Sequence, residues 1–250
     1  YNYWVRLGVV AVSNEVCMQI DELQRYFGVT DLNTMYDRNF LLKISDSAPI
    51  SESQILHANA WIQTAMNFAK KANTEIFDYK GLKKKLTALR DMAMSDSREK
   101  WNQMKDLLST HGIAFVLLPT LDHCPVETVV KWLSPDKVLF AMRDNLTNTG
   151  KFWTDFFNGI GYIMERRLTL TIATGMAIYG DKKVQAVKIK AEDFSKDFLI
   201  PRDDYRIFLE SHSFDRRSVD AFAESLRIHP DIVTFRLQND GVEIPYLTAI

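Results

Sequence analysis

The sequence predicts an α+β fold: a small mixed sheet with a β-hairpin, packed by helices and preceded by a helical region. Apolar residues early in the chain recur at helical spacing, as in 16–27. The apolar run 113–119 instead has the length of a strand. Two further apolar runs, 126–133 and 138–143, are separated only by turn-forming residues. Together they predict a hairpin that follows the helical region.

The N-terminal region 1–111 is expected to be helical throughout. Gly28 is a plausible C-cap for the first helix. Ser51 or Ser53 can provide the N-cap of the next helix. Gly112 marks the end of the region. The expected helices are 16–27, 51–72, 79–94 and 96–111.

The C-terminal half is expected to continue the α+β core over 112–201 and to end in a helical hairpin and tail over 202–250. Two short helices in the tail have the rhythm of a helix-turn-helix, with Ala223 at the tight inner position and Ile228 after the turn. Such a pair can contact DNA, but it is more often a compact helical hairpin. The other expected helices are 151–167, 187–201 and one that begins near Pro201.

Composition describes an ordinary soluble globular chain with 46% hydrophobic and 25% charged residues. The net charge of -1 gives no overall electrostatic reason to bind nucleic acid. Cys17 and Cys124 are too few for a disulfide framework and fit a reducing compartment. No apolar run approaches the roughly 20 residues that span a bilayer. Because the chain starts at Tyr1 rather than Met, we expect a missing N-terminal segment.

The expected helix 151–167 has an unusual centre. Asn158, Gly159 and Gly161 stand where good helix formers are normal, and each interior Gly costs about 1 kcal/mol relative to Ala. Zinc hydrolases carry H-E-x-x-H on such a helix. The two His bind zinc from one face, and the Glu acts as general base. The aromatic frame of this helix would suit that motif.

The segment WLSPDKVLFAMRDN…GKFWTDFFNGIGYIM resembles the centre of the ImmA/IrrE family of zinc metallopeptidase-like domains. In that family, a W-L-S-P-D-K-x-L hairpin leads to a helix containing F-F-H-E-x-G-H. The resemblance extends to AEDFSKDFLIP, to the tail 218–246, and to ELQRYFGV, which is similar to the segment that follows the helix-turn-helix of HigA-like members. The matching positions are Trp132, Leu133, Ser134, Pro135, Asp136, Lys137, Leu139, Phe156, Phe157, Ile160 and Gly161.

The family's chemistry is missing at each motif position. Asn158 replaces the first zinc His, Gly159 the general base and Tyr162 the second zinc His. Lys190 falls on the third ligand, with Glu192 as an alternative alignment. Amide, phenol and ammonium groups do not replace two imidazoles and a carboxylate around zinc. The resemblance therefore implies a degenerate cleft with no catalytic residue, metal or cofactor.

The resemblance implies a non-catalytic regulatory or partner-binding module of a prokaryotic, cytoplasmic transcriptional regulator or antitoxin-type protein. Its partner would be a cognate toxin or regulator, and the chain is expected to form homo-oligomers. DNA would be bound only through a helix-turn-helix that precedes this chain, and no membrane is expected. Two alternatives remain: an active hydrolase with a non-standard metal set, and a small-molecule sensor that uses the vacated cleft.

Two other patterns carry weak chemical signals. His123 and Cys124 are adjacent, as in some metal or nucleophile sites, but neighbouring residues do not face one another. The N-G-I-G stretch at 158–161 lacks the third glycine and the preceding strand of a nucleotide-binding loop.

Overall fold

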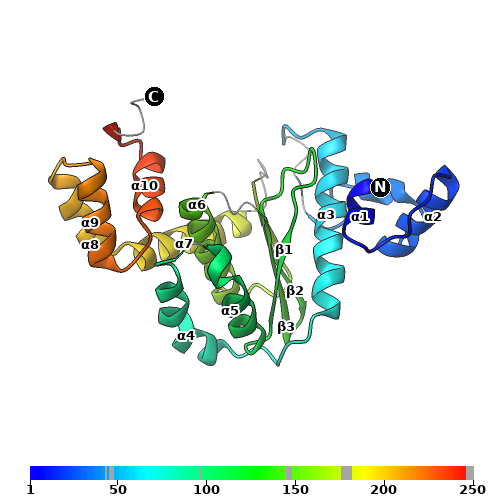
Figure 1. Ribbon diagram of the computed structural model, residues 1–250. Coiled ribbons are helices and arrows are strands. Elements are labelled where there is room, and N and C mark those ends of the chain that lie inside the picture. The colour runs from blue at the N-terminus through cyan, green and yellow to red at the C-terminus, as the bar shows by residue number, and fades with distance from the viewer. Residues whose placement is uncertain (43, 45–47, 96, 145–147, 176–181, 246–250) are drawn as a thin grey trace.

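Four strands and a set of helices build the chain in the computed structural model (Figure 1). The structure describes residues 1–42, 44, 48–95, 97–144, 148–175 and 182–245, with the side chains of 97–99 excepted. The helices pack on both faces of a small mixed sheet, so the predicted α+β class is confirmed.

The sheet has the strand order β1-β3-β2-β4. β2 (Thr128–Ser134) and β3 (Lys137–Arg143) form the predicted antiparallel hairpin. β1 (Ile113–Leu118) lies parallel to β3, and β4 (Thr171–Thr174) lies antiparallel to β2. β4 was not predicted, because four residues are too few to show an alternating pattern.

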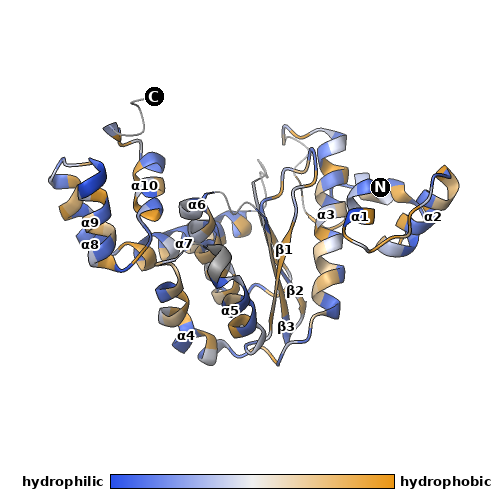
Figure 2. Ribbon diagram, viewed as in Figure 1, coloured by the Kyte–Doolittle hydropathy of each residue, from blue (hydrophilic) through white to orange (hydrophobic). Residues whose placement is uncertain are grey.

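Each face of the sheet supports its own hydrophobic cluster. Side chains alternate along a strand, so Phe140 packs on one face and its neighbours Leu139 and Ala141 on the other. Strands buried on both faces read as continuous apolar runs, which is the pattern of β1 and β3. The sheet is therefore the middle layer of the molecule (Figures 1 and 2).

The N-terminal helices cover one face. α3 (Glu52–Lys71) lies along the sheet, and its outer side holds α1 (Asn2–Arg6), α2 (Val16–Phe27) and the 3₁₀ helix η1 (Leu32–Tyr36) (Figure 1). Ser51 caps α3, with Gln54 completing a reciprocal capping box. Gly28 ends α2 in the left-handed conformation, as predicted.

The remaining helices cover the opposite face. α4 (Tyr79–Met92) and α5 (Ser97–Ser109) pack there beside α6 (Thr149–Met164) and α7 (Lys182–Leu199) (Figure 1). The helices of 1–111 are thus divided between the two faces, since α3 and α5 lie on opposite sides of the sheet.

The C-terminal helices form a small group at one end of the molecule: α8 (Arg202–Glu210), α9 (Arg216–Leu226) and α10 (Pro230–Asn239). α9 and α10 are the expected pair, joined through Arg227 in the left-handed conformation. The start of α10 packs on α6 so closely that a Cβ on Gly150 would lie 2.7 Å from the Cβ of Phe235 and against the Asp231 carbonyl.

This packing bears on DNA contact by the tail. The second helix of a DNA-binding helix-turn-helix presents its N-terminal residues to the major groove. In this chain one face of the corresponding end of α10 packs on α6, with Ile232 and Val233 buried, while Asp231 in the same turn stays exposed. Within the described part of the chain, no helix is both long enough and apolar enough to cross a membrane.

Candidate functional site

The glycines of α6 are sites of close helix packing. A Cβ on Gly161 would lie 2.8 Å from the Cβ of Ala191 on α7. A Cβ on Gly159 would overlap the ring of Phe140 on β3. Carbon atoms pack best at about 3.5–4.0 Å, so neither position accepts a side chain without movement. The glycines let α6 lie directly on the sheet and on α7.

A narrow stripe of α6 carries its polar side chains. One residue advances a helix by about 100°, so positions 151, 155, 158 and 162 fall within an arc of about 60°. This stripe therefore holds Lys151, Asp155, Asn158 and Tyr162 in register. Asn158 and Tyr162, the two positions of the family's zinc His residues, share one face of the helix.

Gly159 points away from this stripe and toward the sheet. Its neighbour Phe140 is fully buried, and the Phe140 ring stacks on Phe115 with a centroid distance of 4.7 Å. Phe156 lies on the same ring cluster, 5.6 Å from Phe140. The space beside position 159, where the resemblance would align a general base, is thus filled by an aromatic ring of the core.

Tyr162 fills the space at the second ligand position. Its side chain is 1% exposed, and burial raises the pKa of its phenol, with further contributions from the negative charges of Glu192 and Asp155. The phenol therefore stays protonated across the physiological pH range. Asn158, one turn earlier, is half-buried.

Lys190 lies apart from the stripe. It is exposed, and its ammonium is 3.6 Å from the Glu165 carboxylate at the end of α6. Glu192 lies about 160° from Lys190 around α7 and is the residue whose charge acts on Tyr162. The structure thus brings Asn158 and Tyr162 together, turns Gly159 to the sheet and places Lys190 on the other flank of α7.

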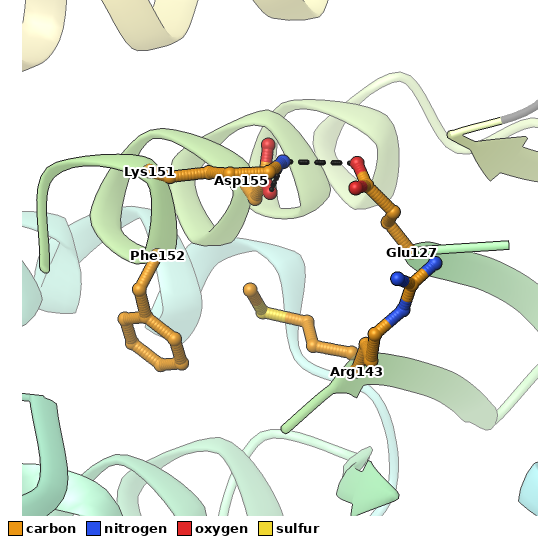
Figure 3. A pocket seen from close by; sticks show the side chains of 6 residues that line it. Glu127, Arg143, Lys151, Phe152 and Asp155 are labelled. Atoms are coloured by element: carbon orange, nitrogen blue, oxygen red, sulfur yellow. Dashed lines mark hydrogen bonds and ion pairs between the residues drawn. The ribbon is translucent and has the colours of Figure 1, made fainter. Parts of the chain in front are cut away.

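A charged cluster lies at the N-terminal end of the stripe, and the sequence alone did not predict it (Figure 3). Lys151 donates to Glu127 at 2.9 Å and to Asp155 at 2.6 Å. Arg143 lies beside them and donates to the carbonyl of Val126 at 3.0 Å. The i, i+4 spacing of Lys151 and Asp155 was visible in the sequence. Glu127 precedes β2 and joins them only through the tertiary fold.

Burial and pairing act in opposite directions on this cluster. Burial raises the pKa of Asp155, and the adjacent Lys151 opposes that rise. Burial alone would lower the pKa of Lys151, but Asp155 and Glu127 raise it overall. A cavity of about 10 Å³ lies between these residues and Phe152, which is roughly the space of one water. The cluster therefore joins α6 to β2 beside a space of about one water.

The other sequence patterns are structural. Burial raises the pKa of the Cys124 thiol to about 11, which keeps it protonated and a poor nucleophile near neutral pH. The neighbouring His123 lies by the ring of His57, with centroids 5.9 Å apart. The N-G-I-G stretch lies inside α6, away from any loop that could hold phosphate. In the described ranges, no three His, Cys, Asp or Glu side chains are grouped so that they could hold a metal.

Comparison with known proteins adds no relative. No protein-family model matches the sequence, and a search of curated proteins finds no match either. The ImmA/IrrE resemblance therefore depends on the residues quoted above.

Proposed function

We propose that the chain is a non-catalytic regulatory or partner-binding module of a prokaryotic regulator or antitoxin-type protein. The packing of Phe140 against Gly159 carries the proposal. In a peptidase helix this position needs a carboxylate that reaches a metal-bound water. Here the backbone of α6 lies on an aromatic ring, which leaves no space for that side chain.

The ligand positions support the same conclusion. Asn158 offers an amide, and Tyr162 offers a phenol whose pKa is raised by burial and by the charges of Glu192 and Asp155. Zinc sites are built from thiolates, neutral imidazoles and carboxylates. Tyr162 is also buried, at 1% exposed, so its ring belongs to the packed core. These observations favour a protein-binding role over the hydrolase and sensor alternatives.

An exposed apolar stripe on α2 supports partner binding. Val16 is 66% exposed and Ile20 is 40% exposed, although they lie one turn apart on one face of the helix. Val12, just before the helix, is 79% exposed. Contiguous exposed apolar groups often mark interaction sites. We propose that this stripe contacts the protein partner of the module, a cognate toxin or regulator in the cytoplasm.

The catalytic question is tested by metal content and peptidase activity. Purified protein is dialysed against buffer with a weak chelator, and zinc is then measured per chain. We expect much less than one zinc per chain and no peptide hydrolysis. Stoichiometric zinc that is lost in Asn158→Ala would refute the non-catalytic assignment.

Partner binding is tested separately. The protein is co-expressed with the product of the neighbouring gene and analysed by size-exclusion chromatography with light scattering. We expect a complex that Val16→Ser/Ile20→Ser weakens and that Lys84→Ser, an exposed change on α4, leaves intact. A complex that forms equally with both variants would contradict the role of α2. A variant that loses only self-association would instead assign the stripe to a homo-oligomer.

A further inference from the structure

A second cavity lies on the opposite side of the sheet from α6; it is lined by residues of α1, α2, η1 and α3 and is partly open to solvent. Its volume is about 330 Å³. Trp4 and Phe27 meet edge to face in its wall, with ring centroids 5.3 Å apart, and Met35 and Leu56 continue the apolar lining. Small-molecule sites commonly have volumes of about 300–1,000 Å³ and walls of this kind.

Polar side chains of α3 fix the walls of this cavity. Thr64 accepts a hydrogen bond from the Trp4 indole at 2.8 Å, which holds α1. Asn59 donates to the carbonyl of Met35 at 2.8 Å, which holds η1. Asn67 donates to the carbonyl of Tyr26 at 2.7 Å, which holds the end of α2. A cavity with anchored walls needs little ordering when a ligand binds, and this lowers the free-energy cost of binding.

His57 supplies a polar group to the lining. Its Nδ1 lies 2.5 Å from the carbonyl oxygen of Ser53. A carbonyl oxygen only accepts, so Nδ1 donates to it, and in the tautomer with its proton on Nδ1 the Nε2 atom is an acceptor. A ligand that matches this cavity would therefore present a flat apolar body and one hydrogen-bond donor.

We propose that this cavity is a binding site for a bicyclic aromatic molecule that carries one hydroxyl or N–H donor. An apolar cavity of about 150 Å³ accommodates one benzene, so a cavity of 330 Å³ fits two fused rings. The rings pack on the more accessible apolar lining at Leu23, Leu32 and Leu56, and the donor binds His57. The site is independent of the degenerate cleft, because the sheet and α3 lie between them.

The experiment compares 2-naphthol with naphthalene, which lacks the donor. Binding to the full chain is measured by ligand-observed NMR and isothermal titration calorimetry. We expect both compounds to bind one per chain, with 2-naphthol about 5-fold tighter because of one net hydrogen bond. His57→Leu should remove that preference and leave naphthalene binding intact.

A second experiment fills the cavity with a larger side chain. Ala60 lines the cavity, and Ala60→Leu should weaken both compounds at least 10-fold. Lys70→Leu, an exposed change on the same helix, should leave both affinities unchanged. If Ala60→Leu does not fold, Leu56→Phe serves the same purpose. Absence of binding at the solubility limit, or unchanged binding to the filled variant, would overturn the proposal.

Discussion

Replacing Gly159 by Ala tests whether α6 can lie close to the sheet only because position 159 has no side chain. At an unconstrained interior helix position, this change stabilises by about 1 kcal/mol. Here the new methyl would overlap the Phe140 ring, which cannot retreat easily because Phe115 stacks on it at 4.7 Å. Overpacking a core costs about 1–3 kcal/mol. Subtracting the propensity gain, we expect a net loss of up to about 2 kcal/mol in the free energy of unfolding.

A double-mutant cycle with Phe140→Leu isolates the contact. The smaller side chain leaves space for the new methyl, so Gly159→Ala should be much less harmful in that background. We expect a coupling free energy of at least about 1 kcal/mol, within the range seen for contacting residues. Urea unfolding of the four proteins gives the values, and equal m-values confirm comparable unfolding.

A matched control comes from the preceding position. Asn158 is half-buried on the polar stripe, so Asn158→Ala should change the free energy of unfolding by about 0.5 kcal/mol or less in either direction. Two results would show that the Phe140 ring does not fill the space beside position 159. One is a higher free energy of unfolding for Gly159→Ala; the other is strictly additive free-energy changes for Gly159→Ala and Phe140→Leu.

Two further predictions concern titratable groups. Lys151→Met removes the cation shared by Glu127 and Asp155 and should cost about 1–2 kcal/mol at pH 7 in urea unfolding. The loss should be smaller near pH 4. Burial raises the pKa of Asp155 above 3.8, so its carboxylate takes up a proton there and no longer needs the lysine charge. Equal losses at pH 7 and pH 4 would contradict this. The pKa of Lys151 is raised above 10.5, so its contribution is complete below that value and the wild type should lose it as pH rises further. Ellman's reagent at pH 8 should modify exposed Cys17 at once but Cys124 only after unfolding, because burial raises the pKa of Cys124 to about 11; rapid modification of both in the native protein would count against its burial.

Local signals in the sequence were sufficient for the main elements. The capping box at Ser51, the left-handed Gly28 and the turn between β2 and β3 are each specified by residues close together in the chain. β4 is different, because its four residues form a strand through pairing with β2, about 40 positions away. Which face of the sheet each helix covers also depends on contacts between distant residues.

The candidate site was predicted in part for the same reason. The spacing of Asn158 and Tyr162 guarantees a shared helix face, and the structure has it. That Gly159 lies on Phe140, and that Glu192 rather than Lys190 acts on Tyr162, depends on how α6 meets the sheet and α7. The Glu127 contribution to the charged cluster likewise joins two elements separated in the sequence.

The single sheet between two hydrophobic clusters makes the two halves of the chain mechanically dependent. Leu139 and Ala141 support α3, while Phe140 between them supports α6, so neither helix can shift without tilting the same strand. Stacked layers are separated by only about 10 Å. α3 and α6 therefore share β3 as a common support. Cutting the chain after residue 111 would remove α3 from one face of the sheet and α4 and α5 from the other, so we expect it to expose both hydrophobic clusters.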